Sequence, residues 1–395
     1  MATRSPPSRT AEAPRADERL IAIRAQGEDK EPIEEFVLAK AGPIIVRMAM
    51  QWGYILRVRT RWAADEDMRD NFREKAINDF KDLGIEPDAI QRFASVKHIE
   101  VQLYDSGLKT EDGTALLLDV ASEIPWEYLL SAATQKAGRF ESLLVTRCLA
   151  NESDVARAKP SNFLFVESAP GRIEQIYYFE DEETRLSAAV KLKENHGLTF
   201  SRTEPFAKLL GKIRDTDWKA MHVTGVDTHQ AAWLIEDFYS GVKKKGEVID
   251  KTDRLQDGMV LRGDQDRELP VRYDKLADLL LQSKKKQPGV ISLNLYYSGA
   301  RTARELVKRG VYAAVGFLDE IDDEFAELFF QAFYWAWCHD NQSIPDAFLD
   351  AWSAMDGDRM HGTSIVIWLG RSMLGPSDTS ANGPEPVKKT RRGGR

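Results

Sequence analysis

The chain has 395 residues, is 43% hydrophobic and 30% charged, and carries a formal net charge of −8. These values are typical of a soluble globular protein of about two to three domains, and the negative charge gives no electrostatic footprint for nucleic acid. Two cysteines cannot form a disulfide framework, and no apolar run reaches the roughly 18 to 20 residues that span a bilayer. The N-terminus lacks the apolar core of a secretory signal, so we expect a cytoplasmic protein.

The first hundred residues divide by composition. Residues 1–30 are rich in Pro, Arg, Ala and Glu and poor in large apolar side chains, which predicts a disordered tail. Residues 31–96 predict a mainly helical N-terminal extension. Its clearest helix covers 65–83, where apolar residues recur at helical spacing at Met68, Phe72, Ala76, Ile77 and Phe80. The apolar clusters at 44–46 and 54–56 fit either short strands or a helix, and Pro87 begins a further helix.

Residues 97–372 alternate between short apolar runs and helical patterns. Strands are expected at 98–104, 115–120, 163–166, 198–201, 220–224, 258–261, 290–295, 311–317 and 363–369. Helices are expected at 181–192, 205–213, 229–239, 273–281, 303–307 and 324–337, and one begins near Pro125. Such alternation predicts an α/β fold with a largely parallel sheet. Residues 373–395 end in KKTRRGGR and predict a disordered basic tail.

The stretch 289–317 reads as strand, tight turn, helix and strand, which is one βαβ unit. The turn after its first strand lies at the carboxyl edge of a parallel sheet, where open α/β proteins place their binding sites. Residues 293–299, LNLYYSG, form the end of that strand and the turn, so any site is expected there.

Five segments in chain order resemble one family. They are IPWEYL (124–129), AMHVTG (220–225), LQDGMVLRGD (255–264) with the helical YDKLADLL after it, LNLYYSG (293–299), and the stretch 310–352. Together they make residues 97–372 similar to a CHAT domain, which has the caspase-like, clan CD cysteine peptidase fold and occurs in bacterial proteins. The resemblance implies a caspase-like, largely parallel sheet flanked by helices.

The resemblance also implies a mechanism that this sequence has lost. In active members a histidine after one strand activates a cysteine after the next, and the thiolate attacks a peptide carbonyl. The family's histidine position corresponds to Val226 and its cysteine position to Tyr296. Valine cannot accept a proton, and a phenol with an ordinary pKa near 10 is a poor substitute for a thiolate. We therefore expect no catalytic residues.

The neighbouring positions imply a vacant cleft. Its lining would be His222, Asp227, Tyr296, Tyr297, Ser298 and Arg301. His222 is expected inside its strand with hydrogen-bond partners. A displaced Ser298–His229 pair is an alternative dyad, but Ser298 shaping the turn and His229 capping its helix is the simpler interpretation.

The sequence shows no pattern typical of a second catalytic site, a metal site or a cofactor site. Cys148 and Cys338 are expected to be structural, because Cys338 and His339 are neighbours on a helix and do not face each other. The dense aromatic run at 329–337 predicts a core helix. The six histidines lack the spacing of a helical zinc site, and no phosphate loop or dinucleotide fingerprint is present. We therefore expect neither a cofactor nor a metal.

The leading functional hypothesis is a catalytically inactive CHAT-type pseudo-peptidase that acts as a regulatory, scaffolding or inhibitory binding subunit. The family's context suggests a bacterial defence or protease-cascade system. The expected partner is a protein, either another caspase-like peptidase or a sensor or effector protein, with no nucleic acid and no membrane. One alternative is an active caspase-like cysteine endopeptidase with a displaced catalytic site. Another is a ligand or peptide sensor that uses the vacant cleft.

Overall fold

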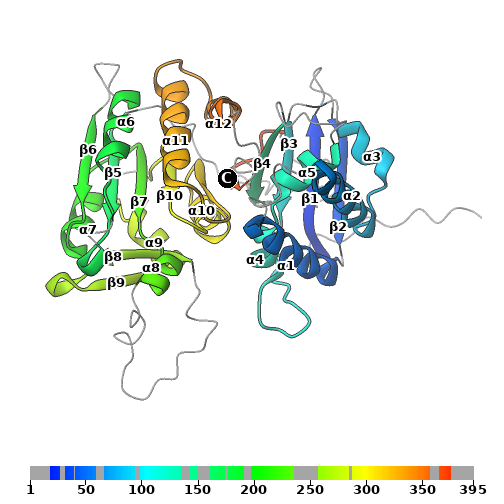
Figure 1. The fold of residues 1–395 in the computed structure, drawn as a ribbon, viewed down its shortest axis with the longest axis horizontal. Helices are drawn as coiled ribbons and strands as arrows, with labels where there is room; N and C mark the ends of the chain where they lie inside the picture. Colours follow the sequence, from blue (N-terminus) through cyan, green and yellow to red (C-terminus); the bar gives the residue numbers. More distant parts are fainter. Residues whose placement is uncertain are drawn as a thin grey trace, which may run out of the picture.

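A 10-stranded mixed sheet organises the protein, with strand order β2-β1-β3-β4-β12-β11-β10-β7-β5-β6. In Figure 1 this sheet runs from β6 at one side to β1 and β2 at the other. The structure is a computed structural model, and it describes residues 18–26, 32–39, 41–58, 66–93, 96, 98–134, 143–149, 161–173, 177–190, 197–234, 257–283, 287–355 and 364–374.

The strands form two parallel blocks that meet at β12. The sheet contains β1 (Arg19–Gln26), β2 (Pro32–Ala39), β3 (His98–Leu103), β4 (Leu144–Leu149), β5 (Phe163–Ser168), β6 (Leu198–Arg202), β7 (Ala220–Gly225), β10 (Val290–Asn294), β11 (Ala313–Phe317) and β12 (Ile365–Leu369). Strands β6, β5, β7, β10 and β11 are parallel, and so are β3, β4 and β12. The pair β11–β12 is antiparallel, as are β1–β2 and β1–β3. A separate hairpin joins β8 (Gly258–Arg262) to β9 (Glu268–Arg272).

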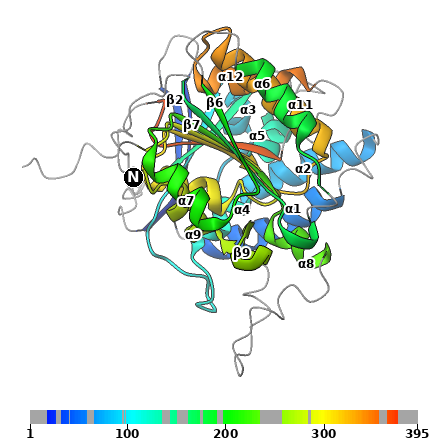
Figure 2. The same cartoon turned by 90° about the vertical axis from the view of Figure 1, so that its left-hand side faces the viewer.

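Helices cover both faces of the sheet, as Figure 2 shows. One face carries α1 (Gly42–Val58), α2 (Glu66–Asp82), α3 (Pro87–Arg92), α4 (Leu117–Glu123), α5 (Trp126–Thr134), α7 (Phe206–Asp215), α9 (Tyr273–Leu280) and α10 (Arg301–Lys308). The other carries α6 (Glu180–Val190), α11 (Asp323–Cys338) and α12 (Ile344–Ala354). Helix α8 (Thr228–Leu234) packs on a third, small core near β8, and short 3-10 turns lie at Gly171–Ile173 and Asp264–Asp266.

The alternation of strand side chains explains why two large cores form. In β5, Leu164 and Val166 enter the core on the face that carries α7, α9 and α10, whereas Phe163 and Phe165 enter the core under α6, α11 and α12. Successive strand side chains point to opposite faces, so a strand covered on both sides is expected to be mostly apolar. The expected α/β class with a largely parallel sheet flanked by helices is confirmed.

Several local expectations are wrong. The run 115–120 was expected to be a strand, but Leu117–Glu123 forms α4; a short apolar run does not distinguish a buried strand from a buried helix. Residues 19–26 fall in the expected disordered tail, but they form β1 and pair with β3. The N-terminal extension therefore contributes strands as well as helices, and α1 settles the ambiguous 44–56 segment as helix.

Other strands and helices were expected and are present. Helix α2 coincides with the 65–83 pattern, and β3, β5, β6, β7, β10 and β11 lie where strands were predicted. Strands β2 and β4 and helix α12 were not predicted from the sequence. The end of the expected 229–239 helix and the expected basic tail from 375 onward lie outside the described residues.

Candidate functional site

The site expected from the sequence lies where β7 and β10 end side by side. These strands are parallel neighbours, with Thr224 opposite Asn294. Gly225 closes β7 with a φ of 151°, and a Cβ there would lie 2.3 Å from the carbonyl oxygen of Ser168. Only glycine fits that approach. The turn therefore holds residues 226 and 227 directly against the end of β5.

Val226, which the CHAT resemblance places at the histidine position, is an interior residue. Its side chain is fully buried in the small core formed with Ala169, Ile173, Ala231 and Val260. Its N–H donates to Ser168 O, and its carbonyl oxygen accepts from Val260 N at 2.9 Å. Both backbone groups are thus satisfied, and the side chain supplies neither a proton donor nor an acceptor.

Tyr296, which the CHAT resemblance places at the cysteine position, lies in a narrow crevice. The crevice has a volume of about 50 Å³, and its lining includes Tyr177, Glu182, Thr224, Gln230, Asn294, Tyr296, Asp323 and Glu327. The phenol of Tyr296 donates to Asp323 Oδ1 at 3.4 Å. Burial raises the pKa of this phenol further above its ordinary value, with Asp323 adding to the shift. Tyr296 therefore stays protonated and cannot serve as a nucleophile at neutral pH.

Carboxyl groups surround the crevice. Burial, followed by the charge of Glu182, raises the pKa of Glu327 to about 7. Burial and the adjacent Asp322 raise the pKa of Asp323. Glu182 Oε1 accepts from the amide of Asn294 and lies 2.7 Å from His222 Nε2. Like charges at close range favour protonation, which both shifts reflect.

His222 is a buried, fully bonded histidine inside β7. Its Nδ1 lies 2.6 Å from Ser292 Oγ, which in turn lies 2.5 Å from the phenol of Tyr334. Its Nε2 faces Glu182, so both ring nitrogens have partners. The network links β7, β10, α6 and α11 beneath the crevice. A ring bonded on both sides is held in place and has no nitrogen to offer a substrate.

Asp227 begins α8 and is buried. Its Oδ1 accepts from the backbone N–H groups of His229 and Gln230, which is the usual role of an N-cap aspartate. Its Oδ2 is also buried, and no partner reaches it within the described part of the chain. Burial raises the pKa of Asp227 to about 6. Ionised Asp227 therefore costs the folded state free energy at neutral pH, because its carboxylate is buried.

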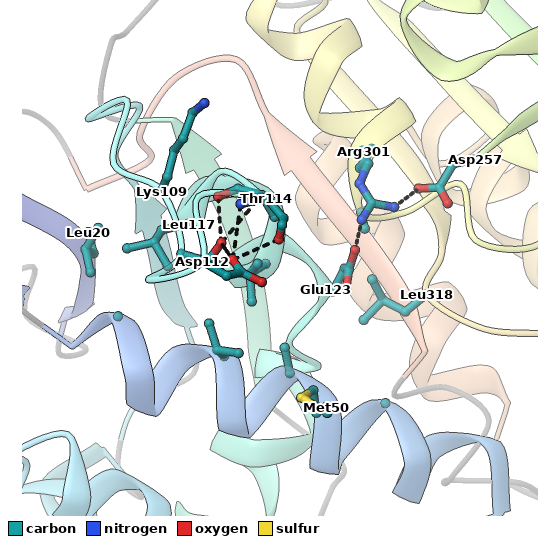
Figure 3. Close-up of a pocket in the computed structure, with 18 of the residues that line it drawn as sticks. Leu20, Met50, Lys109, Asp112, Thr114, Leu117, Glu123, Asp257, Arg301 and Leu318 are labelled. Atoms are coloured by element: carbon teal, nitrogen blue, oxygen red, sulfur yellow. Dashed lines mark hydrogen bonds and ion pairs between the residues drawn. The ribbon is translucent and has the colours of Figure 1, made fainter. Parts of the chain in front are cut away.

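Tyr297 points away from the crevice into a second, much larger cavity of about 1180 Å³. Its φ is 55°, its phenol donates to Glu320 at 3.1 Å, and its ring packs on His229 with centroids 4.5 Å apart. Arg301 lines the same cavity, as do α1 and residues 108–115. We call this space the α1 cavity; Figure 3 shows it with α1 along one wall.

Arg301 is bridged by two carboxylates. It donates to Glu123 and, at 3.2 Å, to Asp257 Oδ2, as the dashed lines in Figure 3 indicate. Asp257 Oδ1 also lies 3.3 Å from His229 Nε2. Burial raises the pKa of Glu123, although the charge of Arg301 opposes the shift. The expected cleft residues therefore separate into two spaces, with Tyr296 in the crevice and Tyr297 and Arg301 in the α1 cavity.

The alternative nucleophiles are occupied or buried. Ser298 Oγ donates to Leu295 O at 2.7 Å and accepts from Phe317 N at 3.2 Å, so it shapes the turn. His229 is engaged by Asp257 and Tyr297 rather than by Ser298. Cys148 in β4 and Cys338 in α11 are both buried free thiols. A substrate carbonyl cannot reach a thiol that is enclosed in the core.

Sequence reasoning missed several residues that shape these two spaces. Glu182 and Glu327 reach the crevice from α6 and α11, and Glu123, Asp257 and Asp319 reach the α1 cavity from three separate segments. Asp323 could have been found from the sequence, because it lies in the stretch 310–352, one of the five segments that resemble the CHAT family. The others are ordinary surface-type acidic residues in the sequence, and only the fold gathers them.

Neither a metal site nor a membrane helix is found in the described part of the chain. No group of three or more His, Cys, Asp or Glu residues there could hold a metal ion. Among the same residues, no helix is both long enough and apolar enough to span a bilayer.

Comparison with known proteins gives a limited result. No family model matches the sequence, and no curated protein matches it. Among solved structures, two crystal structures of the Saccharomyces cerevisiae separase–securin complex match, with 12% and 11% sequence identity and TM-scores of 0.35 and 0.36. Each match covers 63% of this chain and 15% of the other, so the chain spans about 15% of the length of the chain it matches.

Proposed function

We propose that this protein is a caspase-like pseudo-peptidase that binds a protein partner without cleaving it. The observation that carries the proposal is the state of the two dyad positions. Val226 is enclosed in an apolar core, and the phenol of the half-buried Tyr296 donates to Asp323. Neither group can transfer a proton at neutral pH or attack a carbonyl. The CHAT resemblance extends the proposal to a regulatory, scaffolding or inhibitory role in a bacterial defence or protease-cascade system.

Two further observations support binding over hydrolysis. Both cysteines are buried in elements away from the ends of β7 and β10, which disfavours a displaced cysteine dyad. The large α1 cavity opens beside the vacated site and supplies concave surface for a ligand. That cavity also favours a second candidate function, a sensor of a ligand or peptide. Like the first candidate function, this one involves no hydrolysis.

The purified full-length chain is expected to cleave no peptide bond under reducing conditions. The measurement is a panel of fluorogenic peptides with Arg, Lys or Asp before the scissile bond, followed at pH 6 to 8. The matched variants are Cys148→Ala, Cys338→Ala and Ser298→Ala. Cleavage that co-elutes with the chain and disappears in any one of these variants would show that the site lies elsewhere and would overturn the proposal.

A recovery experiment addresses the partner. The tagged chain is purified from its native host, and co-purifying proteins are identified and checked for new termini. We expect an uncleaved partner at a fixed ratio to the chain. A partner that is recovered only as fragments, and intact with the Cys148→Ala or Cys338→Ala variant, would contradict a binding role.

A further inference from the structure

The α1 cavity has the dimensions of a peptide site. Its lining follows α1 from Gly42 to Leu56, and at 1.5 Å per residue this wall is on the order of 20 Å long. Its volume of about 1180 Å³ exceeds the roughly 300 to 1,000 Å³ of most small-molecule sites. About six extended residues, or a helix of about four turns, would span such a wall.

The long wall of the cavity is apolar. Val46, Ala49, Met50 and Leu56 project from α1, and Leu117, Val120 and Leu318 face them. Met50 is 74% exposed. Leu108, in the 108–115 segment that lines the opposite side, is exposed as well. Large apolar side chains gathered at the mouth of a concave site are typical of a surface that binds a partner.

The polar lining is acidic. It contains the carboxylates of Glu111, Asp112, Glu123, Asp257 and Asp319 against the two basic side chains Lys109 and Arg301, a formal net charge of −3. Arg301 is already bridged by Glu123 and Asp257, so its charge is balanced within the protein. Figure 3 shows this bridge at one end of the cavity and the 109–114 segment at the other. The field inside the cavity therefore favours a cationic ligand.

We infer that the α1 cavity binds a basic, amphipathic peptide segment of a protein partner, with apolar side chains against α1 and Lys or Arg side chains toward the exposed Glu111 and Asp112. The inference rests on the proposed binding function and specifies its site and its ligand class. The apolar contacts supply affinity, and the charges select the partner and speed its association.

The test uses three fluorescein-labelled 14-residue peptides and the full-length chain, with binding followed by fluorescence anisotropy. The first peptide combines Leu and Lys in an amphipathic helical pattern, the second has Ser in place of Leu, and the third has Glu in place of Lys. We expect only the Leu/Lys peptide to bind tightly, with affinity that weakens as salt is raised. Equal affinity for the Leu/Lys and Ser/Lys peptides would overturn the inference, because charge alone would then explain binding.

Variants of exposed side chains test whether the Leu/Lys peptide binds in the α1 cavity. Met50→Arg and Glu111→Lys are each expected to weaken binding of the Leu/Lys peptide by about tenfold, which corresponds to about 1.4 kcal/mol. Their matched controls, Tyr178→Arg beside the crevice and Glu324→Lys on α11, alter equally exposed side chains and should leave the affinity unchanged. Loss of affinity in Tyr178→Arg with none in Met50→Arg would move the site to the crevice and overturn the assignment.

Two readouts separate this inference from the proposed function. Mass spectrometry of the bound Leu/Lys peptide would reveal cleavage, which would overturn the non-hydrolytic proposal and leave the cavity assignment standing. Failure of the peptide to bind, without cleavage of any substrate, would overturn the cavity assignment alone. A chain that ends at Leu374 and binds the peptide when the full chain does not would show that the chain's own basic C-terminal segment is the occupant, contrary to our inference.

Discussion

Replacing Arg147 with alanine is expected to lower the free energy of unfolding by about 3 to 5 kcal/mol. Arg147 in β4 is fully buried and donates to both oxygens of Glu127, at 2.7 and 2.5 Å. It also donates to the carbonyl oxygens of Ser122 and Ile124, and its guanidinium lies over the ring of Trp368. Removing it leaves the buried carboxylate of Glu127 and two carbonyl groups without their donor.

Chemical denaturation in urea, followed by tryptophan fluorescence, measures this loss. The matched control is Arg202→Ala, since Arg202 pairs with Glu183 at 2.5 Å but its side chain is 61% exposed. That variant should lose no more than about 1 kcal/mol. A loss of similar size in both variants would mean that burial of the Arg147 pair is not what makes it important. The Arg147–Glu127 ion pair also joins α5 to β4. It therefore gives Glu127, in the 124–129 segment, a structural role.

The second large effect concerns pH and Asp227. Burial raises the pKa of this carboxyl to about 6 from an ordinary value of 3.8. Between these two pH values the folded chain holds a proton that the unfolded chain releases. The contribution of Asp227 to stability is therefore fully present below about pH 4 and is lost as the pH rises through about 6. A difference of about two pKa units corresponds to roughly 3 kcal/mol.

Asp227→Asn should remove this pH dependence. The amide oxygen of asparagine can still accept from the N–H groups of His229 and Gln230 at the start of α8. We expect the variant to gain stability over the wild type as the pH rises from about 4 to 7, and to show no gain at pH 4. Free energies of unfolding measured across that range test this, with Glu324→Gln, an exposed carboxyl, as the control. Parallel stability curves for Asp227→Asn and the wild type would contradict the assignment.

The places of Val226 and Tyr296 after two strands could be predicted from the sequence, because they depend on the apolar runs alone. Val226 and Tyr296 follow buried apolar runs, and these runs became β7 and β10. Strands covered on both faces are mostly apolar, so their approximate extent is visible as an apolar run. The βαβ unit at 289–317 was predicted for the same reason, and Gly310, with φ at 103°, ends its helix as expected.

The residues that surround Val226 and Tyr296 in space could not be predicted from the sequence in the same way. Tyr296 and Tyr297 are adjacent in sequence, yet one enters the crevice with Asp323 and the other the α1 cavity with His229. The 115–120 run was mistaken for a strand because its length and apolarity fit either structure. Nothing in the local pattern of β4 indicates that Arg147 faces the interior, since its partner Glu127 lies on a different element.

By itself the sequence determined the α/β class, the order of the strands and helices around the site, and the identity of Val226 and Tyr296 after two of the strands. These properties follow from local periodicity and from residue identity at the ends of strands. Only the tertiary structure decided that β1 and β2 extend the sheet, that Glu182 bonds His222, and that α1 lies across from Arg301 to enclose a cavity. Such contacts join residues far apart in the chain, and their energies come from burial and charge balance, which no local pattern records.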